Sequence, residues 1–372
     1  MFRRISPWFH AVIPCSIVLL GCALPLVRSA PVPQPKPVTV EVVFCLDTTG
    51  SMTGLIDGAK SKVWAICNQI LNGRPMPALK VGLVAFRDKG DEYVTKVYDL
   101  RDDLDEVHAD VQTFVATGGG DTPEAVNQAL DDAVNKISWS RDPNTLKILY
   151  LVGDAPPHMD YLDDVKYPHT CAVAAKRGIL INTIQCGNDA DCTRYWKDIC
   201  EQGKGAYVAI PQGGGFKGIS TPFDRRLAEI NAELARGTIV FGDPTKREID
   251  LKKAKGVESL SAEVASDRAG YLAKEGRVAR YDLLEAIRAG KCTLASIPSQ
   301  QLPAELQKMT PKRLGEHLER LADKRAKLLD EARDLDRQRG THTRREMDKN
   351  KDSFDAQVLL MLRKQTSRRI FY

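Results

Sequence analysis

Short apolar runs alternate with amphipathic helical stretches from Val38 onward, and this alternation limits the folds open to the chain. Val38–Leu46 is rich in β-branched residues, as expected of a strand buried on both faces. Leu55–Leu71 then places its apolar residues on one side of a helix. Further strands are predicted at Lys80–Phe86, Tyr93–Tyr98, Leu146–Val152, Leu180–Cys186 and Tyr207–Ile210, and further helices at Leu104–Val115 and Ala125–Ile137. This order predicts an α/β fold: a doubly wound, mainly parallel sheet with helices on both faces.

Three polar loops follow or precede the elements at one edge of the predicted sheet. Asp47-Thr48-Thr49-Gly50-Ser51 directly follows the first strand, residues 118–124 precede a helix, and Gly153-Asp154 ends a later strand. Ligands of such sheets bind outside the carboxyl ends of the strands, where these loops are expected to meet. Their carboxylate and hydroxyl oxygens are hard ligands, suited to Mg²⁺, Ca²⁺ or Mn²⁺.

Each loop also has a purely structural interpretation. Thr49 or Ser51 is a suitable N-cap for the helix that follows, and Thr122-Pro123 is a suitable start for the next one. Capping does not explain why Asp47 and Asp154 both end buried apolar strands. Two unpaired carboxylates at that edge would repel each other and would be costly to desolvate, whereas a bound cation removes both costs.

The three loops together resemble the metal-ion-dependent adhesion site of von Willebrand factor type A domains, which have a Rossmann-like fold. Asp47-x-Thr49-x-Ser51 looks like the first motif of that site, and Asp154 is similar to its final aspartate. The middle loop, Asp121-Thr122-Pro123-Glu124, looks closer to the Asp-Ser-Pro-Glu of integrin β-subunit domains of this type, which leaves its direct ligand open. The candidate metal residues are Asp47, Thr49, Ser51, Asp121, Thr122, Glu124 and Asp154. The resemblance spans about residues 38–212.

This resemblance implies a binding domain rather than an enzyme. Asp47, Ser51 and a residue of the middle loop would hold Mg²⁺, or else Ca²⁺ or Mn²⁺, partly through water. One coordination position would stay open for an Asp or Glu carboxylate of a protein partner. The sequence has no G-x-S-x-G, H-E-x-x-H or phosphate-cradling G-x-x-x-x-G-K-[ST] motif, in keeping with a non-enzymatic role.

The N-terminus has the layout of a secretory signal peptide over residues 1–30. Arg3 and Arg4 precede an apolar run from Ala11 to Val27, and small residues follow at positions 29 and 30. Residues 31–37 are Pro-rich and predict a stiff linker. We therefore expect an exported protein, in the cell envelope, the periplasm or secreted. A retained membrane anchor, or a lipoprotein box at Leu19–Cys22, is the alternative.

Beyond residue 212 the sequence predicts a mixed, mostly helical extension over 213–300 and a helical hairpin or coiled-coil-like tail over 301–372. The tail begins with Thr310-Pro311, carries leucines in a seven-residue pattern interrupted at Arg325, and is expected to break at Gly340-Thr341. Residues 311–372 contain 17 Lys and Arg against 11 Asp and Glu, whereas residues 38–212 contain 17 against 25. The basic tail has no aromatic platform for nucleic acid, and export also argues against that partner, so self-association or packing on the first domain is expected instead. The alternative function is accordingly an oligomerising scaffold that acts through the tail, with a passive or metal-free first domain.

Overall fold

The structure is a computed structural model that describes residues 38–216, 218–347, 349 and 351–372. The predicted signal peptide at 1–30 and linker at 31–37 lie outside these residues. Within the described ranges, no helix has both the length and the apolar character needed to cross a bilayer.

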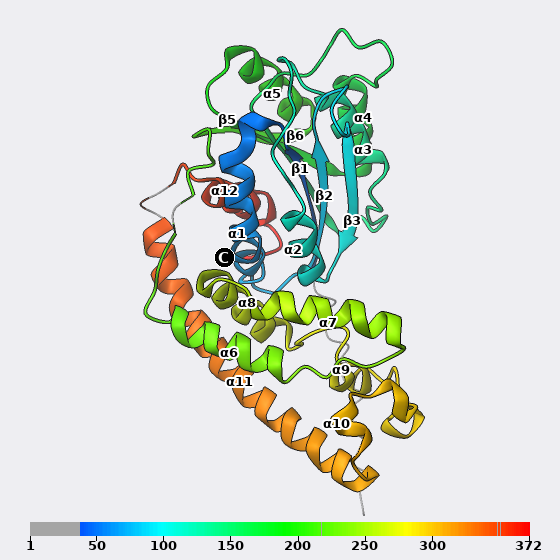
Figure 1. The fold of residues 1–372 in the computed structure, drawn as a ribbon. Helices are drawn as coiled ribbons and strands as arrows, with labels where there is room; N and C mark the ends of the chain where they lie inside the picture. The colour runs from blue at the N-terminus through cyan, green and yellow to red at the C-terminus, as the bar shows by residue number, and fades with distance from the viewer. Residues whose placement is uncertain (1–37, 217, 348, 350) are drawn as a thin grey trace, which may run out of the picture. The chain divides into compact units, whose positions relative to one another are not determined.

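A six-stranded sheet forms the centre of the fold (Figure 1). Its strands are β1 (Thr39–Asp47), β2 (Ala78–Phe86), β3 (Thr95–Arg101), β4 (Leu146–Gly153), β5 (Ile179–Cys186) and β6 (Lys204–Ile210). They lie in the order β3-β2-β1-β4-β5-β6, and every neighbouring pair is parallel except β2 with β3. The predicted doubly wound, mainly parallel sheet is confirmed, with its antiparallel strand at the edge.

The side chains of β1 alternate between two apolar cores, one on each face of the sheet. Phe44 and Leu46 join the core that contains α1 (Thr53–Ile70), α2 (Leu104–Gln112) and a helix from the C-terminal end of the chain. Val43 and Cys45 belong to the opposite core. The helices of that second face are α3 (Val126–Asn135), α4 (Tyr167–Arg177) and α5 (Ala190–Gln202). This alternation is what a strand buried on both faces requires.

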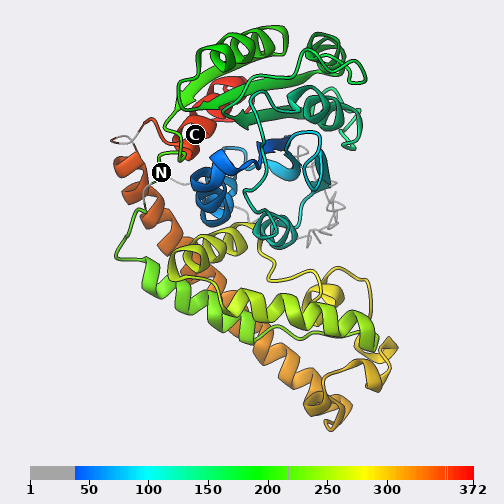
Figure 2. The same ribbon diagram turned by 45° about the horizontal axis from the view of Figure 1, so that its top comes forward.

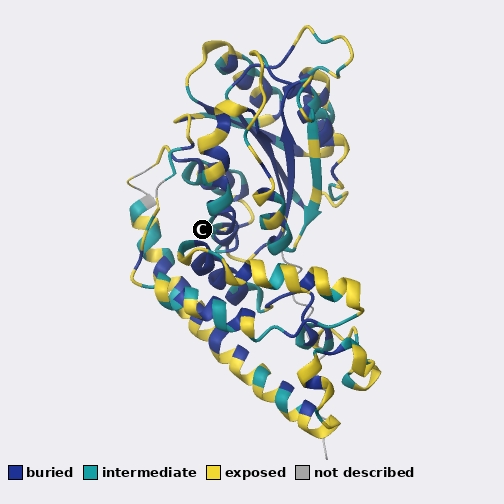
Figure 3. Ribbon diagram, in the orientation of Figure 1, coloured by how far each residue is buried: buried dark blue, intermediate teal, exposed yellow. Residues whose placement is uncertain are grey.

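The chain after β6 is mostly helical, as expected. Its helices are α6 (Asp224–Arg236), α7 (Pro244–Glu258), α8 (Ala262–Glu275), α9 (Leu283–Arg288), α10 (Ala304–Gln307), α11 (Pro311–Met347) and α12 (Phe354–Thr366). In Figure 3 the central strands are largely buried, whereas α11 carries exposed residues along most of its length. Arg325 explains the interruption of the leucine pattern in α11. Its guanidinium lies 2.6 and 2.7 Å from the two carboxylate oxygens of Asp282, which is fully buried.

The tail differs from the expected hairpin. The break predicted at Gly340-Thr341 is absent, because α11 continues as one helix of 37 residues to Met347. A single glycine costs a helix only about 1 kcal/mol, which the contacts of α11 with α6 and α8 can offset. Helix α12 does not run back along α11 but packs beside α1 (Figures 1 and 2).

Helix α12 covers part of the sheet face that α1 leaves open. The Phe354 ring lies 6.1 Å from the ring of Phe44 in β1, and the Tyr150 hydroxyl of β4 donates a hydrogen bond of 3.1 Å to the Val358 carbonyl. Near its end, Gln365 exchanges hydrogen bonds with Asn182 of β5. Helix α12, near the C-terminal end of the chain, thus completes the apolar core on one face of the sheet.

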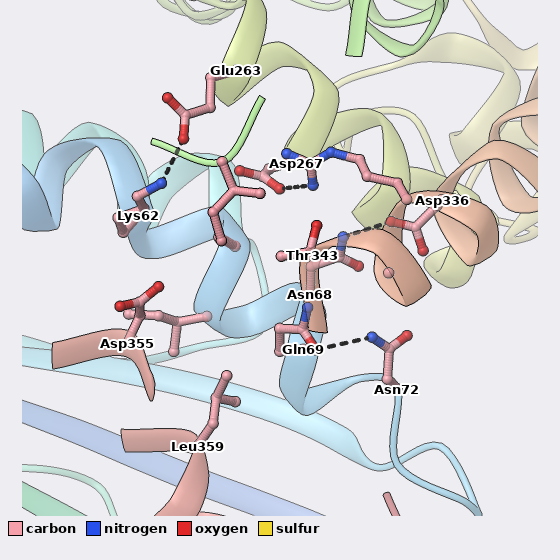
Figure 4. A pocket seen from close by; sticks show the side chains of 15 residues that line it. Lys62, Asn68, Gln69, Asn72, Glu263, Asp267, Asp336, Thr343, Asp355 and Leu359 are labelled. Atoms are coloured by element: carbon pink, nitrogen blue, oxygen red, sulfur yellow. Dashed lines mark hydrogen bonds and ion pairs between the residues drawn. The ribbon is translucent and has the colours of Figure 1, made fainter. Parts of the chain in front are cut away.

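Buried polar contacts connect α1 to the helical region (Figure 4). The Lys62 ammonium lies 2.5 Å from a Glu263 carboxylate oxygen of α8, and the Asn68 amide donates 2.9 Å to Asp336 of α11. Asp336 also pairs with Lys274 of α8. Because each of these side chains is largely buried except Glu263, the contacts hold α1, α8 and α11 in one arrangement.

The packing of α12 predicts that Phe354→Ala lowers the free energy of unfolding much more than Leu360→Ala does. Phe354 is 2% exposed, so Phe354→Ala should lower the free energy of unfolding by about 3–5 kcal/mol through lost burial and a cavity. Leu360 lies in the same helix but is 60% exposed, so Leu360→Ala should change it by less than about 0.5 kcal/mol. Urea unfolding of both variants measures the difference, and equal small losses would contradict the packing of α12 on the sheet.

Candidate metal site

The predicted first loop folds as a tight turn around the carboxylate of Asp47. The Thr49 amide and hydroxyl both donate to Asp47 Oδ1, over 2.8 and 2.7 Å, and the Ser51 hydroxyl lies 3.3 Å from that of Thr49. Asp47 is 1% exposed, and its second oxygen, Oδ2, has no hydrogen-bond partner. One oxygen of Asp47 is therefore fixed by the turn, while the other is buried and unsatisfied.

The middle loop packs directly onto this turn. Gly118 and Gly119 have φ values of 83° and 76°, which favour glycine, and the Gly118 carbonyl accepts a hydrogen bond of 3.1 Å from the Gly50 amide. A Cβ atom on Gly119 would lie 3.0 Å from both Glu124 Oε1 and Thr49 Cβ. The glycines thus allow the loop to bring Glu124 close to Thr49.

Within the middle loop, Glu124 differs from its neighbours in burial. Glu124 is 4% exposed and its Oε2 atom has no hydrogen-bond partner, whereas Asp121 and Thr122 are both exposed. A buried oxygen without a partner is energetically unfavourable, and a bound cation would satisfy it. Glu124 is therefore the residue of this loop best placed to be a direct metal ligand.

The third loop contributes Asp154, immediately after β4. A Cβ atom on Gly153 would lie 3.1 Å from Asp47 Oδ2, so the missing side chain allows the end of β4 to approach Asp47 closely. The Gln212 amide, which follows β6, donates a hydrogen bond of 2.6 Å to Asp154 Oδ2. Asp154 is thus held at the site by a neutral donor rather than by a cationic side chain.

These carboxylates shift each other's protonation. Burial, followed by the negative charge of Asp154, raises the pKa of Asp47 to about 7. Burial, followed by the charges of Asp47 and other nearby carboxylates, raises the pKa of Glu124 to about 9. Among the ion pairs of the described residues, none joins Asp47, Glu124 or Asp154 to a Lys or Arg. A divalent cation supplies the positive charge that the protein does not, so the donor set fits one.

A cavity of about 240 Å³ opens between the three loops. Six of the seven predicted metal residues line it: Thr49, Ser51, Asp121, Thr122, Glu124 and Asp154. Asp47, the seventh, is buried and hydrogen-bonded to Thr49. The structure therefore brings all seven predicted residues to one edge of the sheet, but with different exposure.

Two residues at this edge were missed by sequence reasoning. Asp189 lines the cavity and also accepts a hydrogen bond from the Cys192 amide as the N-cap of α5. Gln212 is the partner of Asp154. Both follow a strand at its carboxyl end, the same signal that identified Asp47 and Asp154, but neither lies in a motif.

The raised pKa values predict that the metal-free protein loses stability as the pH rises. Unfolded Asp and Glu titrate near pH 4, so between about pH 4 and the folded-state values the native chain holds protons that the unfolded chain releases. The free energy of unfolding in chelator should therefore fall by on the order of a few kcal/mol from pH 5 to pH 8. Saturating Mg²⁺ should remove most of this slope, because it favours the ionised carboxylates. Thermal melts at several pH values, with and without Mg²⁺, measure both effects.

Asp47→Asn is the matching control, because it keeps the shape of the side chain and removes one of the charges. In chelator at pH 8 this variant should melt at the same temperature as the parent or higher, and Mg²⁺ should no longer raise its melting temperature. A parent protein that is equally stable at pH 5 and pH 8 in chelator would contradict the electrostatic picture.

Comparison with known proteins agrees with this geometry. The family model of the von Willebrand factor A domain matches residues 41–207. The ariadne-like RING finger protein R811 of Acanthamoeba polyphaga mimivirus is 28% identical over 119 residues, which are 32% of this chain but 11% of that protein. The chain thus spans about a tenth of the length of that relative.

Similar solved structures cover about half of the chain. Proximal thread matrix protein 1 from the mussel byssus aligns with 47% of this chain and 42% of its own, at 14% identity and a TM-score of 0.36. Another structure of that protein is described as having a zinc-occupied MIDAS motif, and it aligns at 15% identity and a TM-score of 0.36, over 46% of this chain and 42% of its own. An aerotolerance-related membrane protein from Bacteroides fragilis aligns with 47% of this chain and 92% of its own, at 14% identity and a TM-score of 0.33. With the family match and the six-stranded sheet together, residues 41–207 of this chain form a von Willebrand factor A domain.

Proposed function

We propose that this chain is an exported binding protein whose von Willebrand factor A domain holds a divalent cation and uses it to bind a protein partner through a carboxylate of that partner. The observation that carries the proposal is the pair of buried, unsatisfied oxygens, Asp47 Oδ2 and Glu124 Oε2, at the edge where the cavity opens. An unpaired buried carboxylate oxygen is costly, and a cation is the ligand that removes the cost.

The donors support Mg²⁺ first, with Ca²⁺ or Mn²⁺ as alternatives. Asp47, Glu124 and Asp154 offer carboxylate oxygens, and Thr49 and Ser51 offer neutral hydroxyl oxygens, which is a hard ligand set. Hydroxyl donors add no negative charge, so the ion keeps an affinity for a further carboxylate. That carboxylate is the group we assign to the partner.

The exposure of the rim supports access by a large partner. Ser51, Asp121 and Thr122 are exposed, so an acidic side chain of another protein can reach the cavity from solvent. The side chains that line the cavity offer carboxylate and hydroxyl oxygens, and we assign these oxygens to holding a cation rather than to catalysis.

Export is part of the proposal and rests on the N-terminal sequence. The Arg3-Arg4 start, the apolar run and the small residues at 29 and 30 are the features of a cleaved signal peptide. N-terminal sequencing of the mature protein, purified from its own host after fractionation, should give a start near residue 30 or 31 in an extracytoplasmic fraction. A cytoplasmic protein that still begins at Met1 would contradict export without affecting the metal site.

The binding role is tested with peptides that differ only in their acid groups. Immobilised full-length mature chain should bind a subset of Asp- or Glu-containing peptides from a displayed library in Mg²⁺, and this binding should fall at least about tenfold in chelator. The Asn and Gln versions of the same peptides should not bind, because an amide does not replace a carboxylate on the ion.

Asp47→Asn should abolish this binding, and Asp57→Asn provides the matched control, because Asp57 lies exposed in α1, the helix that follows the site. Binding that persists in chelator, or that survives Asp47→Asn, would contradict the role of the cation. Peptide binding lost equally in both variants would point to a general charge effect instead.

A further inference from the structure

A second cluster of ligand atoms lies at the same edge of the sheet, outside the seven predicted residues except for one. Asp88 follows β2, Asp121 belongs to the middle loop, and His158 lies in the loop after β4. One carboxylate oxygen of each aspartate and one ring nitrogen of the histidine lie within 4.8 Å of one another. We propose that Asp88, Asp121 and His158 form a second cation site, which takes a divalent transition-metal ion of the Zn²⁺ type.

The histidine is held as a metal ligand would be. His158 is 5% exposed, and its Nδ1 atom lies 2.8 Å from Asp160 Oδ1. Backbone hydrogen bonds also fix the position of His158. Its backbone amide donates a hydrogen bond of 3.1 Å to the Glu124 carbonyl, and its carbonyl accepts one of 2.7 Å from the side-chain amide of Asn127. In the tautomer that donates the Nδ1 proton to Asp160, the lone pair of Nε2 is available to the cluster, and such a contact orients many metal-bound histidines.

The Nε2 atom of His158 is the second, independent sign of a ligand. It is buried and has no hydrogen-bond partner. Asp88 Oδ2 lies 3.4 Å away, which is longer than the 2.7–2.9 Å usual for a charge-assisted hydrogen bond. Two ligand atoms at this separation are placed so that one ion of the Zn²⁺ type, with bonds of about 2.0–2.1 Å, reaches both.

Tyr161 orients both buried ligands. Its hydroxyl donates to the Asp88 carboxylate, lying 3.0 and 2.8 Å from the two oxygens, and its ring stacks on His158 with centroids 3.9 Å apart. Asp88 is 4% exposed, so its charge is also removed from water. Two buried ligands with fixed orientation are the preorganisation that a metal site needs.

Asp121 leaves the cluster open on one side. Because Asp121 is exposed, an ion can enter from solvent and retain water beside three protein ligands. One imidazole with two carboxylates suits Zn²⁺ and its neighbours among the transition metals, whereas Mg²⁺ prefers oxygen donors throughout. The two sites of this edge therefore differ in the ion they select.

The test isolates the second site by disabling the first. Full-length mature chain carrying Asp47→Asn, stripped with chelator and titrated with Zn²⁺ by calorimetry, should bind one ion per chain. X-ray absorption of the zinc form should show imidazole scattering, since no histidine lines the first cavity. Adding His158→Gln should weaken zinc binding at least about tenfold and remove that scattering. Adding His169→Gln, which alters an exposed histidine of α4, should change neither result.

Asp121→Asn guards against a folding artefact, because this residue is exposed and its loss leaves the buried ligands in place. In the Asp47→Asn background it should weaken zinc binding while leaving the melting temperature of the zinc-free protein unchanged. The proposal is overturned if Asp47→Asn binds no zinc at micromolar concentration, or if His158→Gln binds it as tightly as His158 does. If Mg²⁺ binding at Asp47 fails while the zinc site of Asp47→Asn remains, the proposed function falls and this inference stands.

Discussion

Three carboxylates meet at the carboxyl edge of a mainly parallel sheet, and no Lys or Arg of the described residues forms an ion pair with them; the loops of this edge are shaped by that constraint. The parallel register fixes where β1 and β4 end, so Asp47 and Asp154 are brought together by the fold itself. Glycines at 119 and 153 allow the loops to close around them without a steric clash. Burial of Asp47 and Glu124, followed by the charges of the neighbouring carboxylates, raises the pKa of both groups. The unfavourable free energy of burying these carboxylates is offset when a cation binds to them.

The helical region contacts the first domain at the far end of α1 from the site. Helix α1 begins just after Ser51 and runs away from the site, so its later residues, Lys62 and Asn68, reach α8 and α11 (Figure 4). Helix α12 then returns to cover the sheet face beside α1. The first domain and the tail, which look separate in the sequence, therefore pack against each other. The apolar side of α12 is buried against the sheet of the first domain.

Local sequence patterns predicted the parts that local chemistry determines. The strands follow from β-branched runs, and the turn around Asp47 follows from Asp-x-Thr-x-Ser. The relative burial of Glu124, Asp121 and Thr122 could not be predicted, because it depends on how the middle loop packs on Thr49. The position of α12 could not be predicted either, because no local sequence pattern shows which part of the sheet the other helices leave uncovered. His158, beside two prolines, reads as a surface residue, and only the fold of the loop after β4 shows that it is buried.

The placement of the helical region explains why the site edge stays open to solvent. In Figure 1 the helices α6, α7, α9 and α10 gather at the end of the sheet opposite to the one toward which β2 points. Because β1 and β4 are parallel to β2, Asp47 and Asp154 lie at the end away from those helices. Asp88 and Asp121 belong to loops of that same free edge, as their contacts with His158 show. The helical region thus packs at one end of the sheet, whereas the unpartnered oxygens of Asp47 and Glu124 lie at the other. An accessible edge that brings together the carboxylates of Asp47, Glu124 and Asp154, none of which forms an ion pair with a Lys or Arg of the described residues, offers ligands suited to a divalent cation.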